Sequence, residues 1–302
     1  MSDFYEAVSS ALGEDNVLRD VPLSEMTTFH VGGLADYVVS PVDATQLSVI
    51  LRLCRDYGMP FFVLGNGSNI LASDKGYRGV IIRILSGMEN VEIHGTVVKA
   101  AAGAKLIKVA RDASKAGLTG LEFATGIPGT IGGAIYMNAG AYGGEMKDVT
   151  KSVTVMDYEG NIHVLSCKDM DYSYRHSAIE TNSYIVLEVE LQLKKGIQEE
   201  IDNKIDELSS ARRTKQPLEY PSAGSTFKRP EGYFAGKLIS DAGLKGYSIG
   251  GAMVSTKHAG FVINAGDATA EDIMKLIMHI KKEVNSQFGV MLETEVKTLG
   301  EF

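Results

Sequence analysis

Residues 126–134 read Gly126-Ile127-Pro128-Gly129-Thr130-Ile131-Gly132-Gly133-Ala134, and this glycine-rich stretch decides how the rest of the chain is interpreted. A similar run, Gly65-Asn66-Gly67-Ser68-Asn69, lies about 60 residues earlier and directly follows the apolar segment Phe61–Leu64. Glycine lets backbone amides approach a ligand closely, and successive amides form a nest for phosphate oxygens. Two such loops favour a long ligand that carries a diphosphate and a ring system.

Neither loop fits the common nucleotide-binding motifs. No Gly-Lys-Ser/Thr follows either loop, so a P-loop is excluded. The later loop places its glycines at 126, 129 and 132 rather than in a Gly-x-Gly-x-x-Gly arrangement, so a standard Rossmann site for NAD is not expected. One such loop taken alone is equally consistent with a set of tight turns.

The hydrophobic periodicity of the rest of the chain predicts a mixed α+β fold. The predicted helices and strands are helices at 43–58, 104–116, from 196 to before Pro217, and 269–288, and strands at 61–64, 80–84, 97–101, 153–155, 185–193 and 290–296. Asp43 is predicted to cap the first helix and Gly58 to end it. Cys54 lies on the apolar stripe of that helix and is interpreted as a core residue. A domain boundary is predicted near residue 194.

Composition narrows the class of protein. The chain has 302 residues, 44% of them hydrophobic and 23% charged, which is typical of a globular protein with two or three lobes. Its formal net charge of −8 argues against a general nucleic-acid binder. Met1–Glu6 lacks the features of a signal peptide, and the apolar runs are too short to cross a bilayer. We therefore expect a cytoplasmic protein without membrane insertion.

Cysteine and histidine offer little chemistry. Two cysteines, Cys54 and Cys167, exclude a disulfide scaffold and a four-cysteine zinc site. The six histidines are scattered and show no His-x-x-x-His spacing. We therefore expect no bound metal.

Several ordered motifs extend from the glycine-rich loops along nearly the whole chain. They are Thr27–Gly33, Gly65–Asn69, Gly126–Gly133, Asn138–Gly143, Tyr174–Ser177, Ala223–Lys228 and Glu293–Val296. In this order and spacing the chain resembles the UDP-N-acetylenolpyruvoylglucosamine reductase family, flavoenzymes of bacterial peptidoglycan synthesis, in its shorter subtype. The resemblance implies a two-lobed FAD-binding unit of the vanillyl-alcohol-oxidase type and a C-terminal α+β lobe that binds substrate. The implied lobes are residues 1–80, 81–193 and 194–302.

The resemblance also implies the cofactors and their contacts. FAD would be bound non-covalently, and NADPH would be the reductant. The implied FAD-binding residues are Gly65, Asn66, Gly67, Ser68, Asn69, Gly126, Ile127, Gly129, Gly132, Gly133, Asn138 and Gly143.

The reaction that the resemblance implies is the reduction of an enolpyruvyl ether on a UDP-sugar. Hydride addition to the vinyl group spreads negative charge over the neighbouring carboxylate, and a proton must then be delivered to the adjacent carbon. The family match assigns Arg175 to the substrate carboxylate, Ser225 to proton delivery and Glu295 to assistance at the carboxylate. Glu293, two residues before Glu295, is a rival for the last role.

Further contacts and two other functions complete the expectations. Tyr174 and Lys228 are assigned to substrate binding. A flavin-dependent oxidase of the same wider fold and a non-catalytic sugar-nucleotide-binding module are the alternatives. The Ser225 and Glu295 motifs disfavour the oxidase, because an oxidase needs a base rather than an acid. The expected assembly is a monomer or a weak homo-oligomer.

Overall fold

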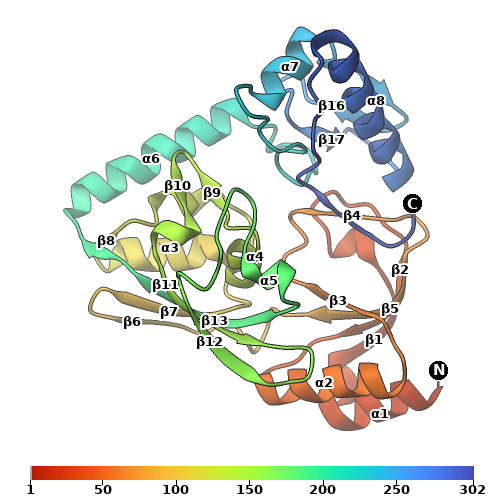
Figure 1. Cartoon of the computed structure of the whole chain (residues 1–302), viewed down its shortest axis with the longest axis vertical. Coiled ribbons are helices and arrows are strands. Elements are labelled where there is room, and N and C mark those ends of the chain that lie inside the picture. The colour runs from red at the N-terminus through yellow and green to blue at the C-terminus, as the bar shows by residue number, and fades with distance from the viewer. Residues whose placement is uncertain (1) are drawn as a thin grey trace. The chain divides into compact units, whose positions relative to one another are not determined.

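The computed structural model describes residues 2–302, which fold into two compact units (Figure 1). Unit 1 comprises residues 1–19, 37–66 and 79–212, and unit 2 comprises residues 20–36, 67–78 and 213–302. The three successive lobes predicted from the sequence stay a prediction. The two units of the structure are not continuous in sequence, because residues 20–36 and 67–78 belong with the C-terminal part of the chain.

In the first part of the chain, two helices pack against a four-stranded sheet. Helices α1 (Ser2–Leu12) and α2 (Ala44–Asp56) lie side by side. The sheet order is β1-β2-β5-β3, with the bounds Val17–Pro22, Leu34–Val39, Tyr77–Arg83 and Phe61–Leu64. Strands β3 and β5 are parallel. The division between the units falls within β1, β2 and β5.

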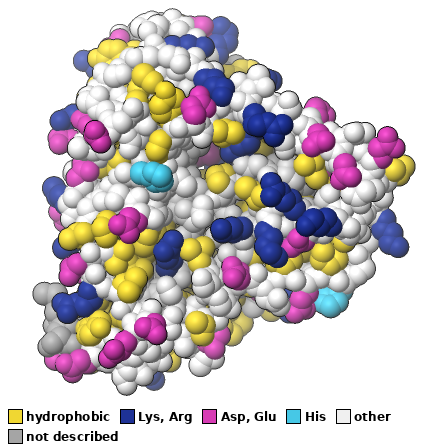
Figure 2. All heavy atoms as spheres, turned by 180° about the vertical axis from the view of Figure 1, so that it is seen from behind, with side chains coloured by type: hydrophobic (Ala, Val, Ile, Leu, Met, Phe, Trp, Pro, Cys, Tyr) yellow, Lys and Arg dark blue, Asp and Glu magenta, His cyan; other side chains and the backbone are white. Residues whose placement is uncertain are grey.

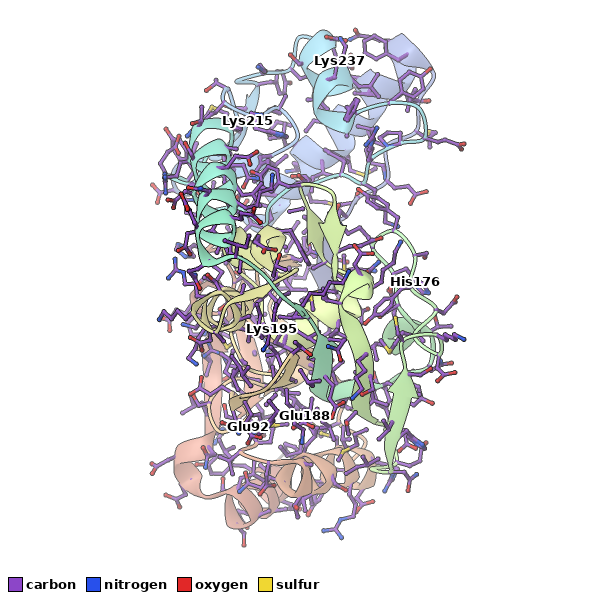
Figure 3. The ribbon with its side chains drawn as sticks, turned by 90° about the vertical axis from the view of Figure 1, so that its left-hand side faces the viewer. Glu92, His176, Glu188, Lys195, Lys215 and Lys237 are labelled. Atoms are coloured by element: carbon purple, nitrogen blue, oxygen red, sulfur yellow. The ribbon has the colours of Figure 1, made fainter. Side chains whose placement is uncertain are left out.

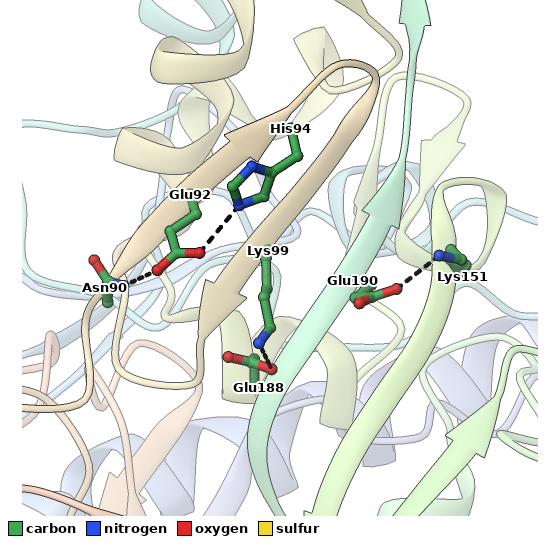
Figure 4. Close-up of polar contacts among 7 residues, drawn as sticks. All are labelled: Asn90, Glu92, His94, Lys99, Lys151, Glu188 and Glu190. Carbon is green, nitrogen blue, oxygen red and sulfur yellow. Dashed lines mark hydrogen bonds and ion pairs between the residues drawn. The ribbon is translucent and has the colours of Figure 1, made fainter.

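The second half of unit 1 is an antiparallel five-stranded sheet. Its order is β12-β11-β13-β7-β6, with the bounds Ile162–Ser166, Thr150–Met156, Ile185–Gln192, Val97–Ala101 and Val91–His94. Alternation puts Val98, Val153 and Val189 in the core and charged side chains on the other face. There Lys99 pairs with Glu188 at 3.0 Å and Lys151 with Glu190 at 2.8 Å (Figure 4).

Shorter elements complete unit 1. Helix α3 (Leu106–Lys115) packs on the 3-10 turn η3 (Glu122–Gly126), and helix α4 (Ile131–Tyr136) packs on β13 and β7. The remaining elements are η1 (Glu14–Asn16), η4 (Met146–Asp148), α5 (Ala178–Thr181), the hairpin β9–β10 (Gly140–Ala141 and Gly144–Glu145) and the pair β8–β14 (Leu118–Thr119 and Lys194–Lys195). Helix α6 (Gln198–Lys215) follows β14. Figure 3 labels Lys195, which lies just before this helix, and Lys215, which is its last residue.

Unit 2 is built around the long helix α8 (Ala270–Phe288). Helix α7 (Ala235–Asp241) and the sheet β15-β16-β17 (Ser248–Ile249, Ala252–Val254, Val262–Asn264) pack against it. Strand β4 (Ile70–Ala72) pairs in parallel with β18 (Lys297–Leu299), and η2 (Leu23–Glu25) precedes the Thr27–Gly33 motif. The core of this unit includes Phe29, Val31 and Leu71 from the N-terminal segments.

Most of the predicted elements are confirmed. Asp43 accepts the Gln46 amide at 2.8 Å and so caps α2, and Gly58 has a left-handed φ of 63° just beyond that helix. Cys54 is 1% exposed and burial raises the pKa of its thiol to about 12, which confirms its interpretation as a core residue.

The predicted strand at 290–296 is wrong. Only Thr294 forms an isolated bridge, with Phe227, and the last strand is instead Lys297–Leu299. Apolar alternation at Val290, Leu292 and Val296 reflects side chains that pack into the unit 2 core from an irregular segment. Among the described residues, no helix is long and apolar enough to cross a membrane. Lys/Arg and Asp/Glu side chains are interspersed on the face shown in Figure 2.

Candidate active site

In unit 1, the structure brings the two glycine-rich loops together. Gly65 and Asn66 leave the end of β3, and the Asn66 side chain donates to the Pro128 carbonyl at 2.5 Å. A Cβ built on Gly65 would lie 2.5 Å from the Thr130 hydroxyl oxygen, so only glycine allows this approach. The two loops therefore form adjoining backbone surfaces of one unit.

The later loop is held by its own backbone contacts. The Ile131 and Gly132 amides donate to the carbonyls of Ala104 and Ala102, both at 2.8 Å. A Cβ on Gly132 would lie 3.2 Å from the Ala102 Cβ, whereas one on Gly133 would meet nothing closer than 3.6 Å. Gly129 accepts the Leu106 amide, and Ile127 packs against the core. A side chain at position 132 would thus be tight against Ala102, whereas one at position 133 would not be.

Arg212 is a neighbour of this loop that the sequence analysis did not identify. It lies in the last turn of α6, and a Cβ on Gly126 would lie 2.7 Å from the Arg212 Cδ. Burial lowers the pKa of the Arg212 guanidinium. One arginine in a polar helix has no local sequence pattern that marks it, since only the tertiary fold places it over Gly126.

Asn138 organises the segment that follows. It is fully buried with a left-handed φ of 41°. Its side-chain amide donates to Glu145 at 2.9 Å and to the Ser173 carbonyl at 3.0 Å, and its oxygen accepts the Lys147 amide at 3.0 Å. These bonds join the β9–β10 hairpin, whose turn is Tyr142-Gly143, to the turn that carries Arg175.

Arg175 lies at the tip of that tight turn. Ser173 and His176 exchange backbone hydrogen bonds of 3.2 Å, and Arg175 between them has a left-handed φ of 57°. Its guanidinium donates to the Gly140 carbonyl at 3.1 Å and lies 5.0 Å from the Tyr174 ring centroid. Figure 3 labels His176 on the same turn. The structure thus places Arg175 and Tyr174 beside the Asn138–Gly143 segment within unit 1.

In unit 2, the structure brings Ser225 and Glu295 to neighbouring segments. Thr226 is buried; its amide donates to the Gly260 carbonyl at 2.8 Å, and its carbonyl accepts the Glu295 amide at 2.8 Å. Ser225 just before it is exposed, and its hydroxyl makes no hydrogen bond to any described residue. The Ser225 hydroxyl is therefore not used to close the turn after Gly224.

Asn69 joins the same backbone. Its side chain donates to the Glu295 carbonyl at 3.2 Å, and its own carbonyl accepts the Lys297 amide at 3.0 Å. Gly67 of the same loop fits only because it lacks a side chain: a Cβ there would lie 2.0 Å from the Met26 carbonyl oxygen. Gly67, Ser68 and Asn69 thus belong to unit 2, next to the segment that holds Glu295.

The two candidate glutamates have different surroundings. Glu293 is well exposed and pairs with Lys228 at 3.2 Å, while the backbone of Lys228 bonds that of Glu293 at 2.9 Å. Glu295 is half-buried, and its amide and carbonyl are both fixed by neighbours. The geometry favours Glu295 over Glu293 as the group held in a defined position.

Residues 35–166 match the family model of an FAD binding domain, and residues 216–299 match that of the UDP-N-acetylenolpyruvoylglucosamine reductase C-terminal domain. The chain is 50% identical to the UDP-N-acetylenolpyruvoylglucosamine reductase of Clostridium perfringens over 99% of this chain and 98% of that protein. The chain belongs to the UDP-N-acetylenolpyruvoylglucosamine reductase family.

Other relatives agree. The enzyme of the same name from Clostridioides difficile is 50% identical over 99% of this chain and 98% of its own. The crystal structure of the Thermus caldophilus reductase superposes with a TM-score of 0.82 at 36% identity, covering 94% of this chain and 99% of that one. The fold expected from the sequence, an FAD-binding domain of the vanillyl-alcohol-oxidase type followed by the family's C-terminal domain, is confirmed.

Family membership fixes the class of chemistry. The protein is an FAD-dependent oxidoreductase of peptidoglycan synthesis that uses NADPH, and this favours neither the oxidase nor the non-catalytic module. The adjoining loops of unit 1 fit the cofactor, because the close approach at Gly65 leaves backbone rather than side chain facing outward. Among the residues that the structure describes, no group of three or more His, Cys, Asp or Glu side chains could hold a metal ion.

Proposed function

We propose that this reductase converts a UDP-N-acetylglucosamine enolpyruvyl ether to the corresponding lactyl ether, UDP-N-acetylmuramate, with Ser225 as the proton donor. The observation that carries the assignment is the exposed Ser225 hydroxyl on a segment fixed from both sides by Thr226. A fixed backbone with an unused hydroxyl is what a positioned acid requires.

The other roles follow from charge and geometry. Bound FAD supplies the hydride. Arg175 binds the substrate carboxylate, since a planar guanidinium matches a carboxylate bidentately and stabilises its growing charge. Glu295 hydrogen-bonds at the same group, and its backbone bonds to Thr226 and Asn69 hold it in place. Tyr174 and Lys228 contact the substrate, with Lys228 suited to an anionic group.

The cofactor contacts are proposed for two sets of loop residues. In unit 1 the backbones of Gly65, Asn66, Gly126, Ile127, Gly129, Gly132 and Gly133 bind FAD, and Gly143 lies near it. Gly67, Ser68 and Asn69, which continue the first loop, are proposed to bind FAD as well. Asn138 acts by holding the hairpin and the Arg175 turn. The binding is non-covalent, so heat or acid releases the flavin from the polypeptide.

The cellular location, the assembly and the partners belong to the same proposal. The protein works in the cytoplasm as a monomer or a weak homo-oligomer, without a nucleic-acid partner. The formal net charge of −8 supports the absence of nucleic acid as a partner.

Anaerobic spectroscopy tests the function. NADPH is expected to bleach the flavin absorbance of the purified protein, and the enolpyruvyl UDP-sugar is expected to restore it without oxygen. Reoxidation by oxygen alone, with no response to the enolpyruvyl sugar, would support the oxidase. A colourless protein that binds the sugar without turnover would support the non-catalytic module.

A further inference from the structure

Arg83 is half-buried, and the described part of the protein leaves one of its buried donors without a partner. Its Nε atom is shielded from solvent and has no hydrogen-bond partner. No other hydrogen bond or ion pair joins its guanidinium to the described residues. Burying a polar donor without an acceptor is costly, so an unbonded Nε on a cationic side chain in a stable fold indicates an anionic acceptor.

The strand register places Arg83 beside the first glycine-rich loop. Arg83 is the last residue of β5 and pairs with Leu64, the residue immediately before Gly65. Val80 and Ile82 of β5 face the core under α1 and α2, so alternation puts Arg83 on the opposite face of the sheet. Ile81 and Leu64 share that face and are buried, which accounts for the shielding of Arg83.

The second glycine-rich loop converges on the same edge. Soon after Arg83, Leu85 approaches Gly103 so closely that a Cβ on Gly103 would lie 2.4 Å from the Leu85 carbonyl oxygen. The neighbouring carbonyls of Ala102 and Ala104 accept the amides of Gly132 and Ile131. Arg83 therefore stands within unit 1 where the chain segments of both loops meet.

We propose that Arg83 binds the diphosphate of FAD. The inference deepens the proposed function, because it rests on FAD as the cofactor of unit 1. Diphosphate oxygens offer the negative charge and the acceptors that the guanidinium lacks inside the protein. The UDP-sugar also carries a diphosphate, so the two sources have to be separated by experiment.

The test compares Arg83→Gln with Arg52→Gln, an exposed arginine of α2. FAD is titrated into the flavin-stripped full-length chain and followed by flavin fluorescence. Arg83→Gln is expected to weaken FAD binding about 10- to 100-fold, because a hydrogen bond to a charged group is lost. Riboflavin, which has the ring but no phosphate, is expected to bind both variants like the parent. Arg83→Lys keeps the positive charge but cannot make two parallel hydrogen bonds. Its FAD affinity is expected to lie between that of the parent and that of Arg83→Gln.

The stability of the flavin-stripped chain distinguishes a ligand-binding arginine from a structural one, because the two roles predict different changes in the urea midpoint. Removing a side chain whose buried Nε has no partner is expected to leave the urea midpoint of Arg83→Gln unchanged or higher, whereas loss of a structural arginine would lower it. Unchanged FAD affinity, or an equal loss for FAD and riboflavin with a lower midpoint, would overturn the proposal. Weaker binding of UDP with unchanged FAD binding would assign Arg83 to the substrate instead. A parent protein that binds no FAD would reject the proposed function itself.

Discussion

If Ser225 is the proton donor, as proposed, its hydroxyl acts in only one of the two halves of the catalytic cycle. Reduction of the flavin by NADPH needs no proton at a carbon, so Ser225→Ala should leave it largely intact. Reoxidation by the enolpyruvyl sugar needs a positioned acid, and its rate should fall about 10²–10⁴-fold. Stopped-flow absorbance of the flavin measures both steps.

Two further variants sharpen this prediction. Ser225→Cys keeps a protic group and should retain more reoxidation than Ser225→Ala. Ser222→Ala changes a hydroxyl three residues earlier in the same segment and should behave like the parent. Reoxidation of Ser225→Ala at the parent rate would move proton delivery to another group, with Glu295 the first candidate.

Substitution of Arg175 by lysine tests whether the planar shape of the guanidinium, and not only its charge, contributes to the reaction. Arg175→Lys keeps the positive charge but loses both the bidentate fork and the bond to Gly140. We expect a loss of about 10²-fold or more in the reoxidation half-reaction, with flavin content unchanged. Single-turnover kinetics with a measured flavin-to-protein ratio checks it, and Arg213→Lys in α6 is the control. Reoxidation of Arg175→Lys at the parent rate would show that bidentate hydrogen bonding by Arg175 is not needed for the reaction.

At the scale of elements, sequence patterns predict local structure well. The Asp43 cap, the apolar stripe of α2 and the Thr269 cap of α8 depend on residues within a few positions of one another. The strand predicted at 290–296 fails because strand pairing is decided by distant segments: β18 is a strand through its pairing with β4. Arg83 and Arg212 were missed for the same reason.

In the candidate site too, local motifs could be predicted from the sequence and long-range contacts could not. The motifs around Arg175, Ser225 and Glu295 could be found in the sequence because the family resemblance carries them. The structure adds what holds them, such as the Asn138 bonds to the Ser173 turn and the Thr226 bonds beside Ser225. Those contacts join residues far apart in the chain, so no local pattern reveals them.

Helix α4 offers a comparison of adjacent glycines. Gly132→Val should destabilise the flavin-stripped protein by about 1–3 kcal/mol, because the new side chain collides with Ala102. Gly133→Ala should fold with parent stability, since its Cβ meets only Thr130 at 3.6 Å. Urea unfolding followed by circular dichroism measures both. Equal stabilities of the two variants would show that the contact with Ala102 is relaxed at no cost.

The start of α8 should respond to pH. Thr269 and Asp272 form a capping box, and the backbone hydrogen bond from Thr269 is the main cause that lowers the pKa of Asp272. A carboxyl group whose pKa is lowered by folding stabilises the fold above its unfolded pKa, and that stabilisation is lost as pH falls through the folded value. Asp272→Ala should therefore lower the urea midpoint at pH 7, and this loss should become progressively smaller below about pH 4.

Urea midpoints between pH 3 and 7 check this prediction. Gln287→Ala, an exposed and uncharged change in the last turn of the same helix, should show no such pH dependence. A cost for Asp272→Ala that stays constant down to pH 3 would mean that the charge of Asp272 does not matter to the cap.

At the scale of the whole molecule, unit 2 is discontinuous in sequence. Thr28 donates to the Ser222 carbonyl at 2.6 Å, and Asp74 accepts the Ala270 and Glu271 amides at the start of α8. Phe29 and Leu71 are fully buried in the core of this unit. The C-terminal part alone lacks all of these contacts.

A fragment of residues 213–302 should therefore fail to fold. Without Phe29 and Leu71 it loses two large buried side chains, each worth about 2–5 kcal/mol, and without β4 it loses the partner of β18. Heteronuclear NMR of the fragment should show poorly dispersed amide signals. Native-like dispersion would mean that the C-terminal part is an independent lobe, as the division at residue 194 predicts.

Because the chain is synthesised from its N-terminus, the N-terminal segments of unit 2 are made well before the C-terminal part that they pack against. Strand β4 leaves the ribosome roughly 230 residues before its partner β18. At 5–20 residues per second, Phe29, Val31 and Leu71 wait roughly 10 to 45 s for the side chains that cover them. Throughout that interval the nascent chain exposes apolar groups and an unpaired strand, which are the features that chaperones bind and that drive aggregation. The yield of this enzyme in a cell should thus depend on chaperone supply more strongly than its finished fold suggests.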